Sequence, residues 1–231
     1  MTKNFHGALN RMALFSAVLA CVLLWFWHPF MRIASANIWL NGVIIGTALF
    51  GTGLCFCEMF RLRPEYMWLR AYLSGRRSAP LPPRLLRPVA LMLGARPLRI
   101  SAATLNGMLE TILIRMEDSR ESIRYITNTL VFLGLLGTFW GLIMTVGGFA
   151  ELINGLSFDD AAVLNAMQTG LSRPLAGMAT AFTSSLMGLG GSLAVGFLGL
   201  QLQLAQNGVF NELEEYLAAH TTPVTSDVVA E

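Results

Sequence analysis

Two stretches of the chain combine hydroxyl side chains with glycine in otherwise apolar sequence. The first stretch carries Thr138 and Thr145, and the second carries Thr180, Ser184 and Ser185. A Ser or Thr hydroxyl donates one hydrogen bond and accepts two without carrying a charge. A row of such hydroxyls could hold water or receive a proton-carrying acid, so the chemistry that these residues suggest is the handling of a proton in an apolar environment.

The small residues of the same two stretches recur at steps of three and four, which is the spacing of one helix face. The glycines on these faces are Gly134, Gly137, Gly141, Gly148, Gly177, Gly188 and Gly191. Small residues let helix backbones approach closely, and Gly137 and Gly141 match the common GxxxG association motif. Helix packing alone would explain the pattern. A pore wall is compatible with it, because such a wall in an oligomer is also a packed surface.

The segments that must position these residues are free of Asp, Glu, Lys and Arg. Four such apolar segments lie near 12–30, 37–57, 129–150 and 176–200. Each holds the roughly 20 residues needed to cross a bilayer core of about 30 Å, and each should be helical because lipid cannot satisfy backbone hydrogen bonds. If the chain helps to move protons, the ionisable carrier must therefore belong to another chain.

Composition and charge placement support a membrane location. Only 13% of the residues are charged, about half the usual fraction of a soluble domain. Of the Lys and Arg residues, fourteen lie before the first segment or between Arg61 and Arg124, whereas Arg32 and Arg173 fall on the opposite loops. The positive-inside rule then places both termini and residues 58–125 in the cytoplasm. A cleavage site at 34–36 is the alternative reading of the first segment, but its bulky run and Arg32 favour a retained helix.

The expected fold is an all-α membrane protein with four transmembrane helices and long cytoplasmic extensions of helices three and four. The predicted order is an N-terminal transmembrane hairpin (1–57), an Arg-rich cytoplasmic insert ending in a long helix (58–128), a pore-forming helix pair (129–200), and a cytoplasmic helix with a disordered tail (201–231). Prolines between 75 and 97 oppose a helix there. A stripe through Leu109, Ile112 and Met116 predicts a helix that continues into the third span.

The segment Leu133-Gly-Leu-Leu-Gly-Thr-Phe-Trp-Gly-Leu-Ile resembles the third-helix signature of the MotA/TolQ/ExbB proton-channel family. Ala181-Phe-Thr-Ser-Ser-Leu-Met-Gly-Leu is similar to its fourth-helix signature. The likeness covers roughly 125–217, and the four-span plan is like MotA. By this alignment Thr138 takes the place of the third-helix pore threonine, and Ser185 stands where the fourth helix normally has Thr. The insert differs from that of flagellar stator subunits, so an envelope energiser or a defence-type motor fits at least as well.

The resemblance implies a channel-forming subunit of a motor driven by the proton motive force, in the bacterial inner membrane. It further implies a homopentamer around two copies of a single-span MotB/TolR/ExbD-like partner that carries the membrane Asp. The residues expected to line the ion pathway are Thr138, Ser185, Thr145, Thr180 and Ser184. Protons are favoured over sodium because the spans offer few polar ligands. The alternatives are a structural membrane scaffold and a secondary transporter, although the inverted repeats or broken helices of transporters are not visible.

Other functions find little support in the residues. His6, His28 and His220 are scattered, so no catalytic residue, metal site or cofactor site is predicted. The cysteines lie inside the predicted spans, where they act as small apolar residues. The Arg-rich insert favours anionic lipid headgroups over nucleic acid, because aromatic interleaving is missing. The charges from Glu110 to Arg124 fit either a solvated helix face or a contact with a cytoplasmic effector.

Overall fold

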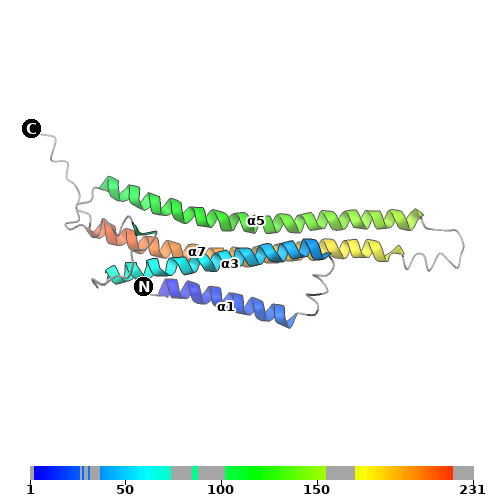
Figure 1. Cartoon of the computed structure of the whole chain (residues 1–231), viewed down its shortest axis with the longest axis horizontal. Helices are drawn as coiled ribbons and strands as arrows, with labels where there is room; N and C mark the ends of the chain where they lie inside the picture. Colours follow the sequence, from blue (N-terminus) through cyan, green and yellow to red (C-terminus); the bar gives the residue numbers. More distant parts are fainter. Residues whose placement is uncertain are drawn as a thin grey trace, which may run out of the picture. The chain divides into compact units, whose positions relative to one another are not determined.

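The structure, a computed structural model, contains four long helices (Figure 1). It describes residues 3–26, 28, 31, 37–73, 85–87, 102–154 and 170–220. The helices are α1 (Lys3–Trp25), α3 (Ile38–Leu73), α5 (Ala102–Asn154) and α7 (Ser172–His220). Each is long and apolar enough to cross a membrane. The prediction of an all-α, multi-pass membrane protein with four candidate spans is therefore confirmed.

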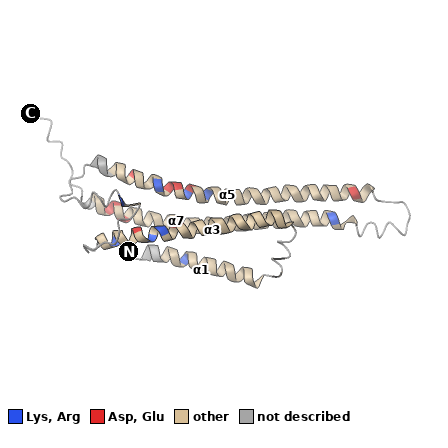
Figure 2. Cartoon of the chain, viewed as in Figure 1, with Lys and Arg blue, Asp and Glu red and all other residues tan. Residues whose placement is uncertain are grey.

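The last two helices are much longer than a bilayer requires. Helix α5 has 53 residues and α7 has 49, which at 1.5 Å per residue gives lengths of roughly 80 and 74 Å. The hydrocarbon core is only about 30 Å thick, so each helix continues well beyond it. The charged residues of α5 gather in its N-terminal half, apart from Glu151 near the other end (Figure 2). The predicted long helix is confirmed, and its stripe at Leu109, Ile112 and Met116 is buried.

Helix α3 extends further than the sequence analysis predicted. It continues sixteen residues past position 57 and contains Pro64. Apolar side chains of this extension, including Met59, Leu62 and Leu69, are buried. They recur at steps of three and seven, so burial of this face stabilises the helix despite the amide hydrogen bond that proline lacks. At the other end of α3, the Asn37 side chain accepts a hydrogen bond from the Leu40 amide (3.3 Å), the arrangement of a helix N-cap.

The chain forms two compact units. The charged unit comprises residues 1–12, 54–122 and 199–231, and the apolar unit comprises residues 13–53 and 123–198. Helices α3, α5 and α7 each contribute to both units. The predicted disordered tail, the candidate cleavage site at 34–36 and most of the proline-rich 75–97 segment lie outside the described residues.

Candidate functional site

Helices α5 and α7 are antiparallel neighbours in the apolar unit. Along α5, residues 134, 141 and 148 lie against residues 188, 177 and 174 of α7, so the partner numbers fall as the α5 numbers rise. We call this contact the glycine seam. Its members are Gly134, Gly137, Gly141 and Gly148 of α5 and Gly177 and Gly188 of α7, each of which faces atoms of the other helix.

The backbones approach most closely at Gly141, Gly177 and Gly188, where no larger side chain would fit. A methyl group built on Gly141 would lie 2.5 Å from the Ala181 nitrogen and 2.5 Å from the Gly177 oxygen. One built on Gly188 would lie 2.6 Å from both the Gly134 Cα and the Leu130 oxygen. Real Cβ atoms essentially never come within 3.0 Å of such atoms. These glycines therefore set the spacing of the two helices.

Helix α3 packs on the same pair through a buried polar contact. The Ser184 hydroxyl donates a 2.9 Å hydrogen bond to the Asn41 side-chain oxygen, and both residues are fully buried. A methyl group on Gly137 would meet Ser184 and would lie 2.9 Å from Leu40 Cδ2. Ser184 thus lies where α3, α5 and α7 meet. A hydrogen bond between membrane helices is worth about 0.6–2 kcal/mol, and it also fixes the register of α3.

Asn41 was not among the candidate residues of the sequence analysis. It is neither an ionisable group nor one of the small residues that mark the last two helices. The sequence does carry a signal for this residue, because Asn41 is the lone amide side chain within the apolar run 38–57. Polar side chains at membrane depth usually face protein rather than lipid, so the residue could have been assigned to an interior position.

Two other predicted hydroxyls are occupied within the apolar unit. The Thr145 hydroxyl is buried and lies 2.8 Å from the Gly141 oxygen and 3.3 Å from the Pro174 oxygen, so it reaches from α5 to α7. Thr180 is buried and donates to the Ala176 oxygen of its own helix (2.9 Å). Together with Ser184, these residues act in contacts between or within helices of one chain.

Thr138 and Ser185 have a different position from the other three hydroxyls. Each follows a residue of the facing pair Gly137 and Ser184, so they lie at the same level of the seam. Successive side chains are turned by about 100° around a helix axis. In two antiparallel helices packed side by side, the residues that follow the two contact residues therefore point to the same side of the pair. Helix α3 packs near Gly137 and Ser184 at Leu40 and Asn41. Thr138 and Ser185 are therefore turned away from α3, and both are half-buried.

The Thr138 hydroxyl has a defined hydrogen-bonding state. It donates a 2.6 Å bond to the Leu135 carbonyl oxygen of its own helix. A hydroxyl that donates to the backbone keeps acceptor capacity on its oxygen. In this rotamer Thr138 can accept a bond from water or from a protonated acid, but it cannot donate to a carboxylate unless the hydroxyl turns.

The charged unit contains a second polar cluster, between α5 and α7. The Arg120 guanidinium donates to the side-chain oxygens of Gln206 (2.8 Å) and Asn207 (2.7 Å), and the Gln206 amide donates to the Ser119 hydroxyl (3.1 Å). Glu117, one turn before Arg120, lies 3.4 Å from it and is largely exposed. The side chains of buried Gln206 and partly buried Arg120 thus supply hydrogen-bond partners to each other. The cluster is therefore explained as a structural contact between α5 and α7.

A buried carboxylate binds part of the Arg-rich insert in the same unit. Glu65 of α3 accepts hydrogen bonds from the backbone amides of Leu85 (2.8 Å) and Leu86 (3.2 Å). The Leu86 side chain is fully buried. These contacts hold the short 85–87 segment against the extension of α3.

No group of His, Cys, Asp and Glu suited to a metal ion occurs among the described residues. Cys55 is buried, whereas Cys21 and Cys57 are exposed, and all three are free thiols. No protein-family model, curated protein or solved structure matches the chain.

Proposed function

We propose that the chain is the channel-forming subunit of a membrane motor or energiser driven by the proton motive force, of the MotA/TolQ/ExbB type. Several copies, five by the resemblance, would surround a single-span partner that carries a membrane Asp. The charged unit would lie in the cytoplasm, because fourteen of the sixteen Lys and Arg residues precede the first span or lie between the second and third.

The placement of Thr138 and Ser185 is the observation that carries this proposal. Two neutral hydroxyls share one level and one side of the α5–α7 pair, on the side turned away from α3. The glycine seam fixes the helix spacing on both sides of that level, because backbone faces backbone at Gly188 and at Gly141. No Asp, Glu, Lys or Arg occurs between Arg124 and Glu151 or between Arg173 and Glu212. Such a surface suits an acid supplied by another chain, because it offers hydrogen bonds without a competing charge.

The hydrogen bond of Thr138 suggests how the site would respond to protonation. With its proton directed to the Leu135 oxygen, the hydroxyl accepts a bond from a neutral carboxylic acid. A carboxylate only accepts hydrogen bonds, so loss of the proton would turn this contact from attractive to repulsive. The partner's acid would then favour a different position relative to the ring. Each proton that crosses supplies about 2.3 kcal/mol per 100 mV.

The first test is the composition of the complex. The tagged chain is expressed with its neighbouring genes, purified in mild detergent and measured by native mass spectrometry. We expect a pentamer that carries two copies of a smaller single-span protein with a membrane Asp. A monomer or dimer without such a companion, under conditions that preserve established membrane complexes, would refute the proposal.

The second test separates an ion pathway from a structural scaffold, the alternative that the glycine seam alone would favour. Thr138→Val removes the hydroxyl and nearly preserves the volume. Thr129→Val is the matched control, because Thr129 also donates to its own backbone (2.8 Å) but lies nine residues earlier, on the opposite face of α5. We expect assembly in both variants and a loss of proton flux in Thr138→Val alone. Equal flux in the two variants would favour the scaffold.

A further inference from the structure

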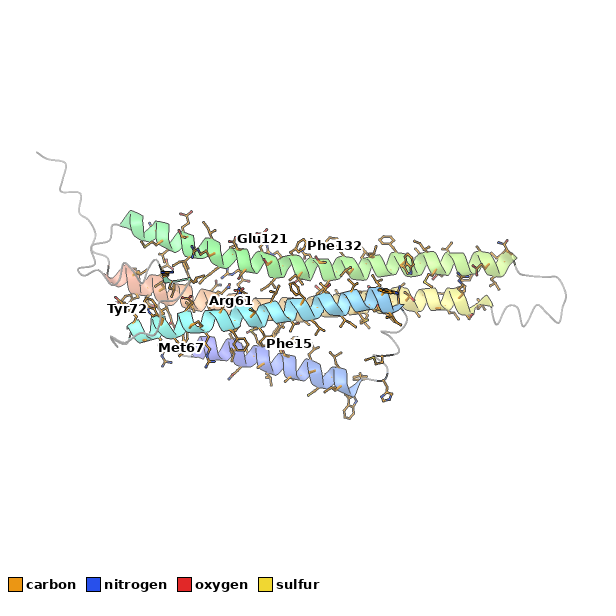
Figure 3. All side chains as sticks on the ribbon, in the orientation of Figure 1. Phe15, Arg61, Met67, Tyr72, Glu121 and Phe132 are labelled. Atoms are coloured by element: carbon orange, nitrogen blue, oxygen red, sulfur yellow. The ribbon has the colours of Figure 1, made fainter. Side chains whose placement is uncertain are left out.

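The extension of α3 in the charged unit has an exposed face that is both apolar and basic. Phe60 and Met67 are 58% and 53% exposed and lie two turns apart on one side of the helix. At 100° per residue, Arg63 and Arg70 flank them on one edge and Arg61 on the other. Figure 3 labels Arg61 and Met67 on this part of α3. We call this surface, residues 60, 61, 63, 67 and 70, the basic face.

Helix α5 has an exposed face of opposite charge in the same unit. Ile114 is 57% exposed, and four exposed acids lie within about 60° of it around the helix. These acids are Glu110, Glu117, Asp118 and Glu121. Glu121 is labelled on α5 in Figure 3. We call this surface, with Ile114 at its centre, the acidic face.

The basic face and the acidic face lie at the same positions along the helix axes of the charged unit. The contacts that α3 and α5 make with α7 establish these positions. The ring of Tyr72 on α3 contacts the ring of Tyr216, with centroids 5.8 Å apart. Ser119 on α5 contacts Gln206, ten residues before Tyr216 on α7. Because α3 runs parallel to α7 in this unit and α5 runs antiparallel, residue 62 of α3 is level with Ser119.

Counting residues along α3 and α5 from that level shows which residues of the two faces lie at the same position along the helix axes. Met67 falls level with Ile114, so the exposed apolar centres have the same height. Arg63 falls one residue from the level of Glu117. Arg70 falls one residue from the level of Glu110. Both basic residues and both acids turn toward the same edge when the two antiparallel helices are brought together without a shift along the helix axis. Asp118, which is level with Arg63, turns toward the other edge.

We propose that the basic face of one copy docks on the acidic face of the next copy. The proposal relies on the proposed function in one respect: copies that share a membrane are related by rotation about its normal, which preserves height. In a row of copies joined by two different faces, one end copy keeps an unused basic face and the other an unused acidic face. Only a closed ring uses both faces of every copy. An anionic membrane surface could attract the basic face, but it would repel the acidic face, whereas a second copy satisfies both.

The test is a cross-link between two differently tagged chains in one membrane. One chain carries Met67→Cys and the other carries Ile114→Cys, and both have Cys21→Ser and Cys57→Ser to remove the exposed thiols. A disulfide needs Cβ atoms within about 4.5 Å. We expect a product bearing both tags after mild oxidation. The matched control replaces Ile114→Cys by Tyr125→Cys, an exposed position on the same side of α5 but about 16 Å further along the helix, and should give little product.

A charge exchange provides a second measurement. Arg70→Glu or Glu110→Arg alone should lower the yield of the 67–114 cross-link several-fold, and the two together should restore it. Absence of the doubly tagged product, or an equal yield at Tyr125→Cys, would overturn the proposal. A response of the Arg70 variant that is not rescued by Glu110→Arg and follows the content of anionic lipid would overturn it in favour of headgroup binding.

The same samples separate this inference from the proposed function. Native mass spectrometry reports the ring and its single-span partner, whereas the cross-link reports which faces meet. An intact ring with its partner but no 67–114 product would refute the docking faces and leave the motor subunit standing. A specific 67–114 product without any partner would support the docking faces and refute the motor subunit.

Discussion

Replacing Gly141 by Ala gives a direct measure of the glycine seam. The added methyl group would lie 2.5 Å from two backbone atoms of α7, whereas ordinary contacts begin near 3.4 Å. The helices would have to separate by about 0.9 Å at this point, and neither the Ala181 nitrogen nor the Gly177 oxygen can move independently of its helix. Overpacking of this kind costs typically about 1–3 kcal/mol.

Gly147→Ala is the matched control, because a methyl group there meets nothing within 4 Å. Both substitutions occur within α5, so both gain the same intrinsic preference of Ala over Gly in a helix, about 1 kcal/mol. That gain cancels when the variants are compared. The free energy of unfolding of Gly141→Ala should therefore be lower than that of Gly147→Ala by about 1–3 kcal/mol.

The measurement is a titration of the purified chain in mild detergent with increasing mole fraction of dodecyl sulfate, followed by circular dichroism and Trp fluorescence. A difference of 1–2 kcal/mol changes the ratio of folded to unfolded protein about 5- to 30-fold, which is easily resolved. Equal midpoints and slopes for the two variants would show that the α5–α7 spacing can relax, and the reasoning from the seam would fail.

Three other substitutions test separate contacts. Asn41→Ala removes the acceptor of a buried hydroxyl and should lower the free energy of unfolding by about 1–3 kcal/mol; adding Ser184→Ala should recover part of that loss, and strictly additive effects would exclude the bond. Glu65→Gln removes one of the two acceptor oxygens that hold the 85–87 segment, so trypsin should cleave the Arg84–Leu85 bond faster than in the parent, and unchanged cleavage would contradict this. Thr138→Ser keeps the hydroxyl and should retain most of the proton flux, whereas flux as low as that of Thr138→Val would point to packing instead.

The helices could be predicted because their signals are local. Apolar runs without charge gave the four spans, and the spacing of Leu109, Ile112 and Met116 gave the extension of α5. The extension of α3 was missed because Pro64 and the surrounding Arg residues obscure its periodicity. Its buried residues Met59, Leu62 and Leu69 nevertheless follow helical steps, so the periodicity of this segment predicts a helix that its composition does not.

The candidate site was only partly predictable, because its geometry depends on which helices meet. Spacing alone could place Thr138 on the same face as its neighbouring glycines, but it could not pair that face with residues 174–188 of α7. The level shared by Thr138 and Ser185 follows from the contact of Gly137 with Ser184. The role of Asn41 also depends on a contact between residues 143 positions apart, which no local pattern specifies.

Direct contact between the backbones of α5 and α7 at parts of the seam limits how the apolar unit can move. Where side chains separate two helices, small shifts are absorbed by changes of rotamer. At Gly141 and Gly188 there is no rotamer to change, so α5 and α7 should tilt and turn together as one stiff element. Flexibility should instead arise at contacts made through large side chains. One such contact joins the rings of Phe15 and Phe197, whose centroids are 4.3 Å apart. Helix α1 can therefore adjust to surrounding lipid while the spacing of α5 and α7 stays fixed.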